Sequence, residues 1–413
     1  MPPIVHPRRY LWTLLGLTGV ALLAIVSFNV LTDPFRVFGT PRRAGLNDRV
    51  PNTSGFDRMS KPYELLRAMP RTVLLGSSTA HSGFLSLAEW NTVLPRPAYN
   101  YALLGANAHE VRLSLAQALR ECPVEAVIMV ADFFAFNAHY RDNERFDPTR
   151  LPAATRGSWP GFLGSDLAAF VLGREALGLS WQTVAASRRA QRSREAVSPS
   201  WQNYSWHVHF RNCERSYLAK WFPAPTHRYQ LASTETGEDR LADFDAVLRL
   251  SAERGVRLIV LCPPIHARFQ EALATAGAWP QYEAWKRELA RRTRAQQARP
   301  SGPGAVELWD FSLFNDATCE AVPADGAGPM RYFFDSAHFT TEFGRIVLDE
   351  ILEGIPRLGV RLDQADIEVH LAGLRSDLHR FRLANPGVVA DVRAALGIPN
   401  GNASPLSVSA LEF

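Results

Sequence analysis

A serine that follows a short apolar segment is the first residue with catalytic potential. In LLGSSTAHSGF, Ser78 comes after the apolar segment Thr72–Leu75, which the residue pattern predicts to be a strand. A serine there lies where open α/β folds place their ligand crevice, and its backbone N–H can face an oxyanion. A serine that caps a helix has the same local pattern, so the motif alone does not assign a role. Ala80 replaces the last glycine of a G-x-S-x-G elbow, and His81 follows closely as a competing base.

The second candidate is RYFFDSAHFT, where two residues separate Asp335 from His338. On a loop or a first helical turn, this spacing lets the carboxylate and the imidazole meet. A serine hydroxyl needs a neutral imidazole to take its proton, and the imidazole needs a partner that fixes its tautomer. Surface Asp and His residues often share this spacing by chance, so the pair gains meaning only together with the serine.

Together, the two segments resemble the first and last sequence blocks of the SGNH/GDSL hydrolase superfamily. Members of that family share a flavodoxin-like sheet and use a Ser/Asp/His triad for ester hydrolysis or acyl transfer. The resemblance covers roughly residues 73–354 and implies that Ser78 is the nucleophile, His338 the base and Asp335 its orienting partner. Gly105 in NYALLGAN matches the family's oxyanion-hole glycine.

The third family block is different in this chain. The family pattern is Gly-x-Asn-Asp, whose Asn donates to the oxyanion, but here the segment reads VADFFAFN and Asp132 takes its place. An ionised Asp cannot donate a hydrogen bond. Several alternatives stay open: the hole uses only backbone groups of Ser78 and Gly105, Asn137 supplies the donor, or Asp132 stays protonated or binds substrate.

Elements that would position these residues alternate along the chain. Apolar segments followed by turn residues occur at 72–75, 98–103, 124–130, 256–261 and 306–311, with amphipathic helical patterns between them. Nearly continuous apolar strands are typical of parallel sheets that are covered on both faces. The sequence therefore predicts an α/β fold with a flavodoxin-like, doubly wound parallel sheet.

Two regions interrupt this alternation within a predicted domain of residues 71–358. Residues 138–240 form a long insertion whose tryptophans suit either sugar stacking or a subdomain core; they are Trp159, Trp181, Trp201, Trp206 and Trp221. Residues 33–70 read as a linker and lead-in, and residues 359–413 as a mainly helical tail.

The N-terminus carries an uncharged apolar segment, YLWTLLGLTGVALLAIVSFNVL, at residues 10–31. Its length suits a ~30 Å hydrocarbon core, and no A-x-A cleavage site follows it. We therefore expect an uncleaved anchor at residues 10–32, with residues 1–9 cytoplasmic and the rest periplasmic, in the inner membrane. Arg8 and Arg9 support this orientation, although basic residues also follow the segment. A buried core helix is the alternative.

Composition restricts the partners. The formal net charge of +4 argues against a nucleic-acid-binding protein, and four scattered cysteines without a CxxC argue against a disulfide scaffold. His207 and His209 with Glu214 resemble a metal site only by composition, so we expect no metal or cofactor. His266 in CPPIHARF is either a substrate contact or a loop histidine. Arg58 and Lys61 are either ion-paired surface residues or a site for an acidic group.

An anchored SGNH domain resembles the proteins of bacterial envelope polysaccharide modification, including those of alginate acetylation and teichoic-acid D-alanylation. Those proteins work beside a membrane-bound O-acyltransferase. The order here, serine first and Asp-x-x-His last, is nearer the D-alanylation arrangement. The resemblance implies transfer or removal of a small acyl group, acetyl in particular, on an envelope or exported glycan. The alternative is a noncatalytic glycan-binding or scaffold subunit, which the missing Gly-x-Asn-Asp block supports.

Overall fold

The computed structural model shows a mixed α/β protein with two compact units. One unit comprises residues 1–67 and 145–198, and the other residues 68–144 and 199–413. The structure describes residues 7–50, 54–85, 87, 93–153, 164–192, 204–224, 227–299 and 305–398.

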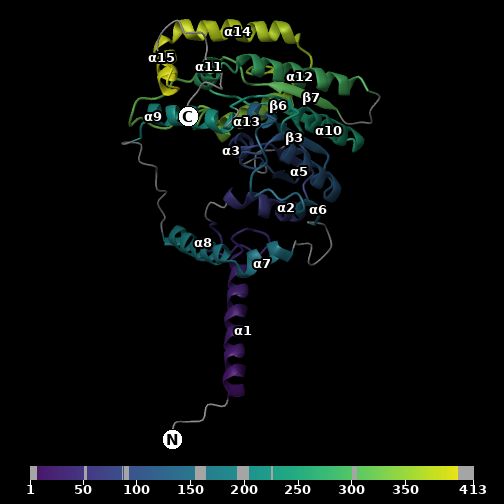
Figure 1. Ribbon diagram of the computed structural model, residues 1–413, viewed down its shortest axis with the longest axis vertical. Helices are drawn as coiled ribbons and strands as arrows, with labels where there is room; N and C mark the ends of the chain where they lie inside the picture. The colour runs from purple at the N-terminus through teal and green to yellow at the C-terminus, as the bar shows by residue number, and fades with distance from the viewer. Residues whose placement is uncertain are drawn as a thin grey trace. The chain divides into compact units, whose positions relative to one another are not determined.

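The larger unit contains a mostly parallel six-stranded sheet in the order β2-β1-β3-β6-β7-β8. Its strands are β1 (Thr72–Leu75), β2 (Ala98–Asn100), β3 (Ala126–Val130), β6 (Arg257–Cys262), β7 (Val306–Asp310) and β8 (Val360–Arg361). Only β8 pairs in the antiparallel direction, with β7. The five predicted strand segments correspond to the five parallel strands, which confirms the prediction of an α/β fold with a parallel sheet (Figure 1).

Helices cover both faces of this sheet. On one face, Leu74, Ile128 and Ile259 lie in register on neighbouring strands, in the core that also receives side chains of three helices. These helices are α3 (Ser78–Gly83), α9 (Trp206–Trp221) and α13 (Thr341–Glu353). On the other face, α5 (Ala108–Glu121) contacts β1, α10 (Arg240–Glu253) contacts β6 and α12 (Trp279–Gln297) contacts β7. Burial on both faces explains why the strands are apolar without alternation.

Helix starts are set by capping residues. The side chains of Asn107, Asp239 and Thr340 accept hydrogen bonds from the first turns of α5, α10 and α13. Such caps satisfy backbone N–H groups that have no partner within the helix.

The remaining elements of this unit are short or peripheral. They are η2 (Phe133–Phe136), β4 (Ala232–Ser233), β5 (Glu238–Asp239), α11 (Ala267–Thr275), α14 (Ile367–Ala384) and α15 (Pro386–Ala395). The C-terminal segment contains the helices α14 and α15, in agreement with the predicted helical tail, and it also contributes β8 to the sheet. Ion pairs tie α14 to the rest of the unit, including Arg287–Glu368 and Arg382–Glu271.

The smaller unit joins the N-terminal segment to part of the predicted insertion. Its helices are α1 (Pro7–Thr32), η1 (Ser54–Phe56), α2 (Asp57–Ala68), α6 (Arg150–Ala153), α7 (Gly164–Leu172) and α8 (Arg174–Arg192). Phe35, Tyr63 and Phe170 share its hydrophobic core. Of the predicted linker and lead-in, residues 33–50 and 54–67 belong to this unit and residues 68–70 to the larger one, and the segment 138–240 is divided between the two units.

Helix α1 is long and apolar enough to span a membrane. Its 26 residues correspond to about 39 Å at ~1.5 Å per residue, more than the hydrocarbon thickness. Its apolar stretch has a mean hydropathy of 2.2 and is almost entirely exposed. Only its C-terminal end is packed, where Asn29 donates to the backbone oxygen of Val171 and Thr32 donates to Ser180.

Candidate active site

The turn after β1 places Ser78 at the first residue of α3. Gly76 has φ +147°, and a Cβ atom there would lie 2.8 Å from the Ala80 Cβ and 3.0 Å from the Val130 oxygen. Only glycine permits this close approach of the turn to β3. Ser78 therefore lies at the carboxyl end of the sheet, half-buried.

The structure brings Ser78, His338 and Asp335 into one chain of hydrogen bonds. The Nε2 atom of His338 lies 2.7 Å from the Ser78 hydroxyl, and its Nδ1 atom lies 2.9 Å from Asp335 Oδ2. When Nδ1 carries the proton and donates to Asp335, Nε2 is left to accept from Ser78. This is the tautomer that a general base requires.

The loop that carries Asp335 and His338 is closed on itself. Phe333 and Phe339 form an antiparallel bridge and are fully buried, and the Phe334 N–H donates to the His338 oxygen. Asp335 Oδ1 accepts from the backbone N–H groups of Ala337 and His338, at 2.8 and 2.9 Å. The loop thus holds the carboxylate against the imidazole before any substrate binds.

Two glycines allow the serine and histidine segments to meet, although 260 positions separate Ser78 from His338. Helices α3 and α13 contact each other, and a Cβ atom on Gly344 would lie 1.9 Å from the Gly83 oxygen. A Cβ atom on Gly83 would lie 1.9 Å from the Phe339 ring. The helix that begins at Ser78 and the helix that follows His338 are therefore in backbone contact, which sets the distance between nucleophile and base.

Electrostatics favour a charged Asp335 and raise the pKa of His338 above its ordinary value. Burial alone raises the pKa of Asp335, but the charge of His338 and the hydrogen bonds from His338 and Ala337 bring that pKa below its ordinary value. Burial alone lowers the pKa of His338, but the charge and hydrogen bond of Asp335, with a smaller contribution from Asp132, raise it above 6.5. Lys220 acts in the opposite direction and lowers the pKa of His338.

The charges around His338 predict how the activity depends on pH. Only neutral His338 accepts the Ser78 proton, so kcat/KM for an ester should rise with pH through the raised pKa of His338. Asp335→Asn removes the group that raises this pKa and should move the inflection to lower pH. Lys220→Gln removes the group that lowers it and should move the inflection to higher pH. Shifts of the same sign in both variants would contradict this assignment.

Tyr217, on α9, is a member of the site that sequence reasoning missed. Its hydroxyl donates to Asp335 Oδ2 at 2.9 Å and lies 3.1 Å from His338 Nδ1. Its ring stacks on Trp221 with a centroid distance of 5.9 Å. Burial and the negative charge of Asp335 raise the pKa of Tyr217, so the phenol keeps its proton and can donate. No local motif marks this residue, because its partner is 118 positions away.

Asp132 lies beside the nucleophile, as an acceptor. Ser77 donates to Asp132 Oδ2 at 2.6 Å, and Thr79 donates to Oδ1 at 2.7 Å. Both hydroxyls flank Ser78, so Asp132 holds the nucleophile turn to the end of β3. Burial raises the pKa of Asp132. These contacts show Asp132 as an acceptor from the turn, and its part in an oxyanion hole stays a prediction.

Asn137 does not supply the missing donor. Its amide nitrogen donates to the backbone oxygens of Trp221 and Arg228, and its oxygen accepts from the backbone of His139 and Gln230. The side chain is fully buried, so these contacts organise the loop after η2.

Gly105 lies in the loop after β2, next to a lysine and a tyrosine. Its φ is +64°, and a Cβ atom there would lie 3.0 Å from both Lys220 Nζ and the Tyr140 hydroxyl. The Tyr140 hydroxyl donates to the Gly105 oxygen at 3.1 Å. The Leu103 N–H donates to the Gly76 oxygen, which joins this loop to the turn before Ser78.

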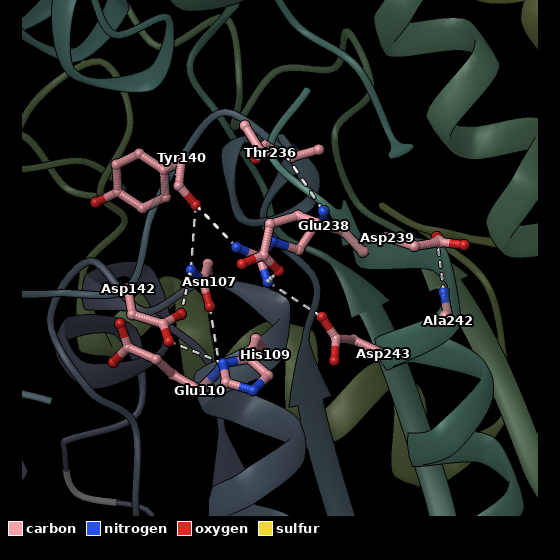
Figure 2. A network of polar contacts seen from close by, with 12 residues as sticks. Asn107, His109, Glu110, Tyr140, Asp142, Thr236, Glu238, Asp239, Ala242 and Asp243 are labelled. Atoms are coloured by element: carbon pink, nitrogen blue, oxygen red, sulfur yellow. Dashed lines mark hydrogen bonds and ion pairs between the residues drawn. The ribbon is translucent and has the colours of Figure 1, made fainter. Parts of the chain in front are cut away.

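A polar network supports the Gly105 loop from behind (Figure 2). Asn107 donates to the Tyr140 oxygen and to Asp142, and fully buried Arg240 donates to the same Tyr140 oxygen. His109 contacts the other oxygen of Asp142. The network links the loop after β2 to the loop after η2 and to the start of α10, and so positions Tyr140 against Gly105.

The contacts of His266 are with the protein itself, and they give no support for the predicted substrate contact. The side chain is buried, its Nδ1 accepts from the Arg268 N–H and its Nε2 lies 2.7 Å from the Glu320 oxygen. Its backbone N–H donates to the oxygen of Ser336, within the Asp335–His338 loop. Burial lowers the pKa of His266 to about 4, so the ring stays neutral and braces this loop.

The other predicted candidates lie elsewhere. His81 is on α3, but the base beside Ser78 is His338. Arg58 and Lys61 belong to the smaller unit and are buried, so they are not surface residues. The Lys61 Nζ atom lies 3.8 Å from Asp57 Oδ2. The trio His207, His209 and Glu214 is not formed, because the carboxylate of Glu214 is paired with Arg268.

A different group of residues with metal-binding side chains lies beside the triad. His209, Cys213 and Asp335 bring one donor atom each within 4.8 Å of one another. None of the four cysteines forms a disulfide.

Comparisons of the sequence with protein-family models and with curated proteins find no match.

Proposed function

We propose that this chain is a membrane-anchored serine esterase or O-acyltransferase of the SGNH type. The observation that supports it most is the hydrogen-bonded chain from Ser78 through His338 to Asp335, at 2.7 and 2.9 Å. Three residues from two distant segments meet in the order that activates a serine, and a closed loop and a glycine contact maintain that geometry.

The sheet supports the same assignment. Its parallel strands run in the order β2-β1-β3-β6-β7, which corresponds to the 2-1-3-4-5 order of flavodoxin-like folds. Ligands in such folds bind at the carboxyl ends of the strands where the order reverses, between the first and third strands. Ser78 follows β1 and Asp132 follows β3, so both lie at this point.

The mechanism begins with attack of the Ser78 hydroxyl oxygen on the ester carbonyl carbon, while His338 Nε2 takes the hydroxyl proton. Asp335 stabilises the imidazolium, and Tyr217 donates to the same carboxylate oxygen, Oδ2, that contacts His338. Backbone N–H groups of Ser78 and Gly105 are the donors for the oxyanion. His338 returns the proton to the leaving alcohol, which leaves an acyl group on Ser78. Water or a glycan hydroxyl then attacks the acyl-enzyme by the same steps.

The proposed substrate is a small acyl ester, acetyl in particular, on a bacterial cell-envelope or exported polysaccharide. A helix that is able to span a membrane supports a location beside the envelope, where a membrane-bound O-acyltransferase is the proposed partner. The tryptophans of the predicted insertion give mixed support for sugar stacking. Trp206 and Trp221 are buried, whereas Trp181 is exposed; Trp159 and Trp201 lie outside the described residues.

The second candidate is a noncatalytic glycan-binding or scaffold subunit. Asp132 favours it, because this residue takes the place of a side-chain donor and accepts from Ser77 and Thr79 instead. The two functions are separated by assaying the full chain in detergent micelles with p-nitrophenyl acetate and with an acetylated glycan. Release or transfer of acetyl supports the enzyme, and glycan binding without turnover supports the subunit.

The proposed orientation is tested with fusions that end after Asn47. Alkaline phosphatase folds only outside the cytoplasm, so this fusion should be active, and a cytoplasmic reporter at the same position should be inactive. The reverse pattern would contradict a periplasmic location and, with it, a periplasmic glycan substrate.

A further inference from the structure

Helix α9 carries two metal-ligating side chains, an imidazole and a thiol, beside the triad. His209 and Cys213 are four positions apart, so they share one face of the helix. The Cys213 sulfur lies 3.7 Å from His209 Nε2 and 3.9 Å from Nδ1. This helix is also the one that brings Tyr217 to Asp335. The same face therefore carries the ligand pair and the contact to the triad.

The third donor is the triad carboxylate itself. Donor atoms of His209, Cys213 and Asp335 lie within 4.8 Å of one another. Ligand atoms around a tetrahedral Zn²⁺ at ~2.0–2.3 Å are about 3.3–3.8 Å apart. The His209–Cys213 spacing already fits this range, and Asp335 needs only a small side-chain movement.

The chemistry of this donor set favours zinc. Imidazole, thiolate and carboxylate are the three side-chain ligand types that Zn²⁺ takes in proteins. One thiolate and one carboxylate together neutralise a divalent cation, which lowers the desolvation penalty at a site made of two half-buried side chains and the buried Asp335. Glu214, the acidic neighbour of Cys213 on α9, is withdrawn into its ion pair with Arg268 and does not compete.

We propose that His209, Cys213 and Asp335 form a Zn²⁺ site that overlaps the triad and switches it off. On binding, the Cys213 thiol releases its proton to solvent, bonds form from zinc to sulfur, imidazole nitrogen and carboxylate oxygen, and water takes the fourth position. Asp335 Oδ2 then serves the metal in place of His338 Nδ1 and the Tyr217 hydroxyl. His338 Nδ1 then keeps only its longer contact to Asp335 Oδ1, at 3.1 Å, on a carboxylate whose negative charge the metal neutralises. The inhibitory consequence rests on the proposed function, whereas metal binding does not.

Binding is measured first, without any activity assay. The full chain in detergent micelles is titrated with Co²⁺, whose thiolate charge-transfer absorption reports a Co–S bond, and Zn²⁺ is then added to displace it. Wild type should show this absorption, and Cys213→Ser should lose it. His209→Ala should weaken binding by at least about tenfold. Matched controls are Cys319→Ser, an exposed cysteine, and His207→Ala, an exposed histidine on the same helix; both should bind as wild type does.

Inhibition is measured next, with p-nitrophenyl acetate. Zn²⁺ should reduce wild-type turnover by at least about tenfold, reversibly on chelation, since the metal takes the Oδ2 contact and the carboxylate charge that orient and stabilise the imidazole. Cys213→Ser and His209→Ala should keep their metal-free activity and resist Zn²⁺, with thermal unfolding confirming that both are folded. Wild type without a thiolate–Co²⁺ band overturns the metal site, and so does a band that survives in Cys213→Ser. A band without zinc inhibition overturns the switch. Absence of esterase activity in metal-free wild type, with the band present, contradicts the proposed enzyme and leaves the metal site standing.

Discussion

Ser78→Ala is expected to reduce turnover of an acetyl ester by about 10⁴- to 10⁶-fold, because it removes the hydroxyl oxygen that lies 2.7 Å from His338 Nε2. His338→Ala should cause a loss of the same order, since the hydroxyl then has no base. The two residues act as one unit, so the double variant should be little worse than either single variant. Asp335→Ala should have a smaller effect, because an imidazole without its partner still accepts a proton part of the time.

A fluorophosphonate probe checks the identity of the nucleophile. It should label wild type at Ser78 and leave Ser78→Ala unlabelled. By its place in the sequence Ser77 is the natural control, but its hydroxyl donates to Asp132, so Ser77→Ala is expected to disturb the turn. Ser82, one helical turn after Ser78 on α3, is the better control. Labelling of a different serine, or full activity of Ser78→Ala, would show that the nucleophile is misassigned.

Gly344→Ala is expected to separate the nucleophile from its base. The added Cβ would lie 1.9 Å from the Gly83 oxygen, a backbone atom, so α3 and α13 must move apart. Overpacking of this kind destabilises a protein by about 1–3 kcal/mol, and a ~1 Å misplacement of reacting groups lowers the rate by about 100-fold. Activity should therefore fall well beyond what the loss of stability explains.

Gly373→Ala on α14 is the matched control. Its added Cβ would meet no atom within 4 Å, so the substitution should stabilise the helix by up to ~1 kcal/mol and leave turnover unchanged. Thermal unfolding and kcat are measured for both variants. Wild-type kcat in a folded Gly344→Ala would mean that the contact between α3 and α13 does not set the distance from Ser78 to His338.

Local sequence was sufficient for the parts that depend on residue type and short-range pattern. The parallel strands could be predicted because strands buried on both faces are apolar along their whole length. Ser78 became a candidate because a Gly-Ser-Ser turn directly follows β1, and the Asp335–His338 pair because both members lie on one short loop. The length and apolar character of α1 are likewise properties of one continuous segment.

Tertiary structure decided which side chains complete the site. Tyr217 contacts Asp335, and Lys220 and Tyr140 lie next to Gly105. These residues are far apart in the sequence, so the local periodicity of apolar residues does not predict the contacts. The sequence showed that Asp132 stands where a donor is expected, but only the packing of Ser77 and Thr79 against its carboxylate makes it an acceptor.

The local sequence pattern also could not predict that residues 138–240 are divided between two units. Aromatic and apolar residues mark a buried segment, but they do not say against which partner it packs. Here Phe170 joins Phe35 and Tyr63 near the N-terminal helix, whereas Phe210 joins the core under the sheet. The residue types determined that these side chains are buried, and the three-dimensional arrangement of the chain determined the core to which each of them belongs, because hydrophobic burial is not directional.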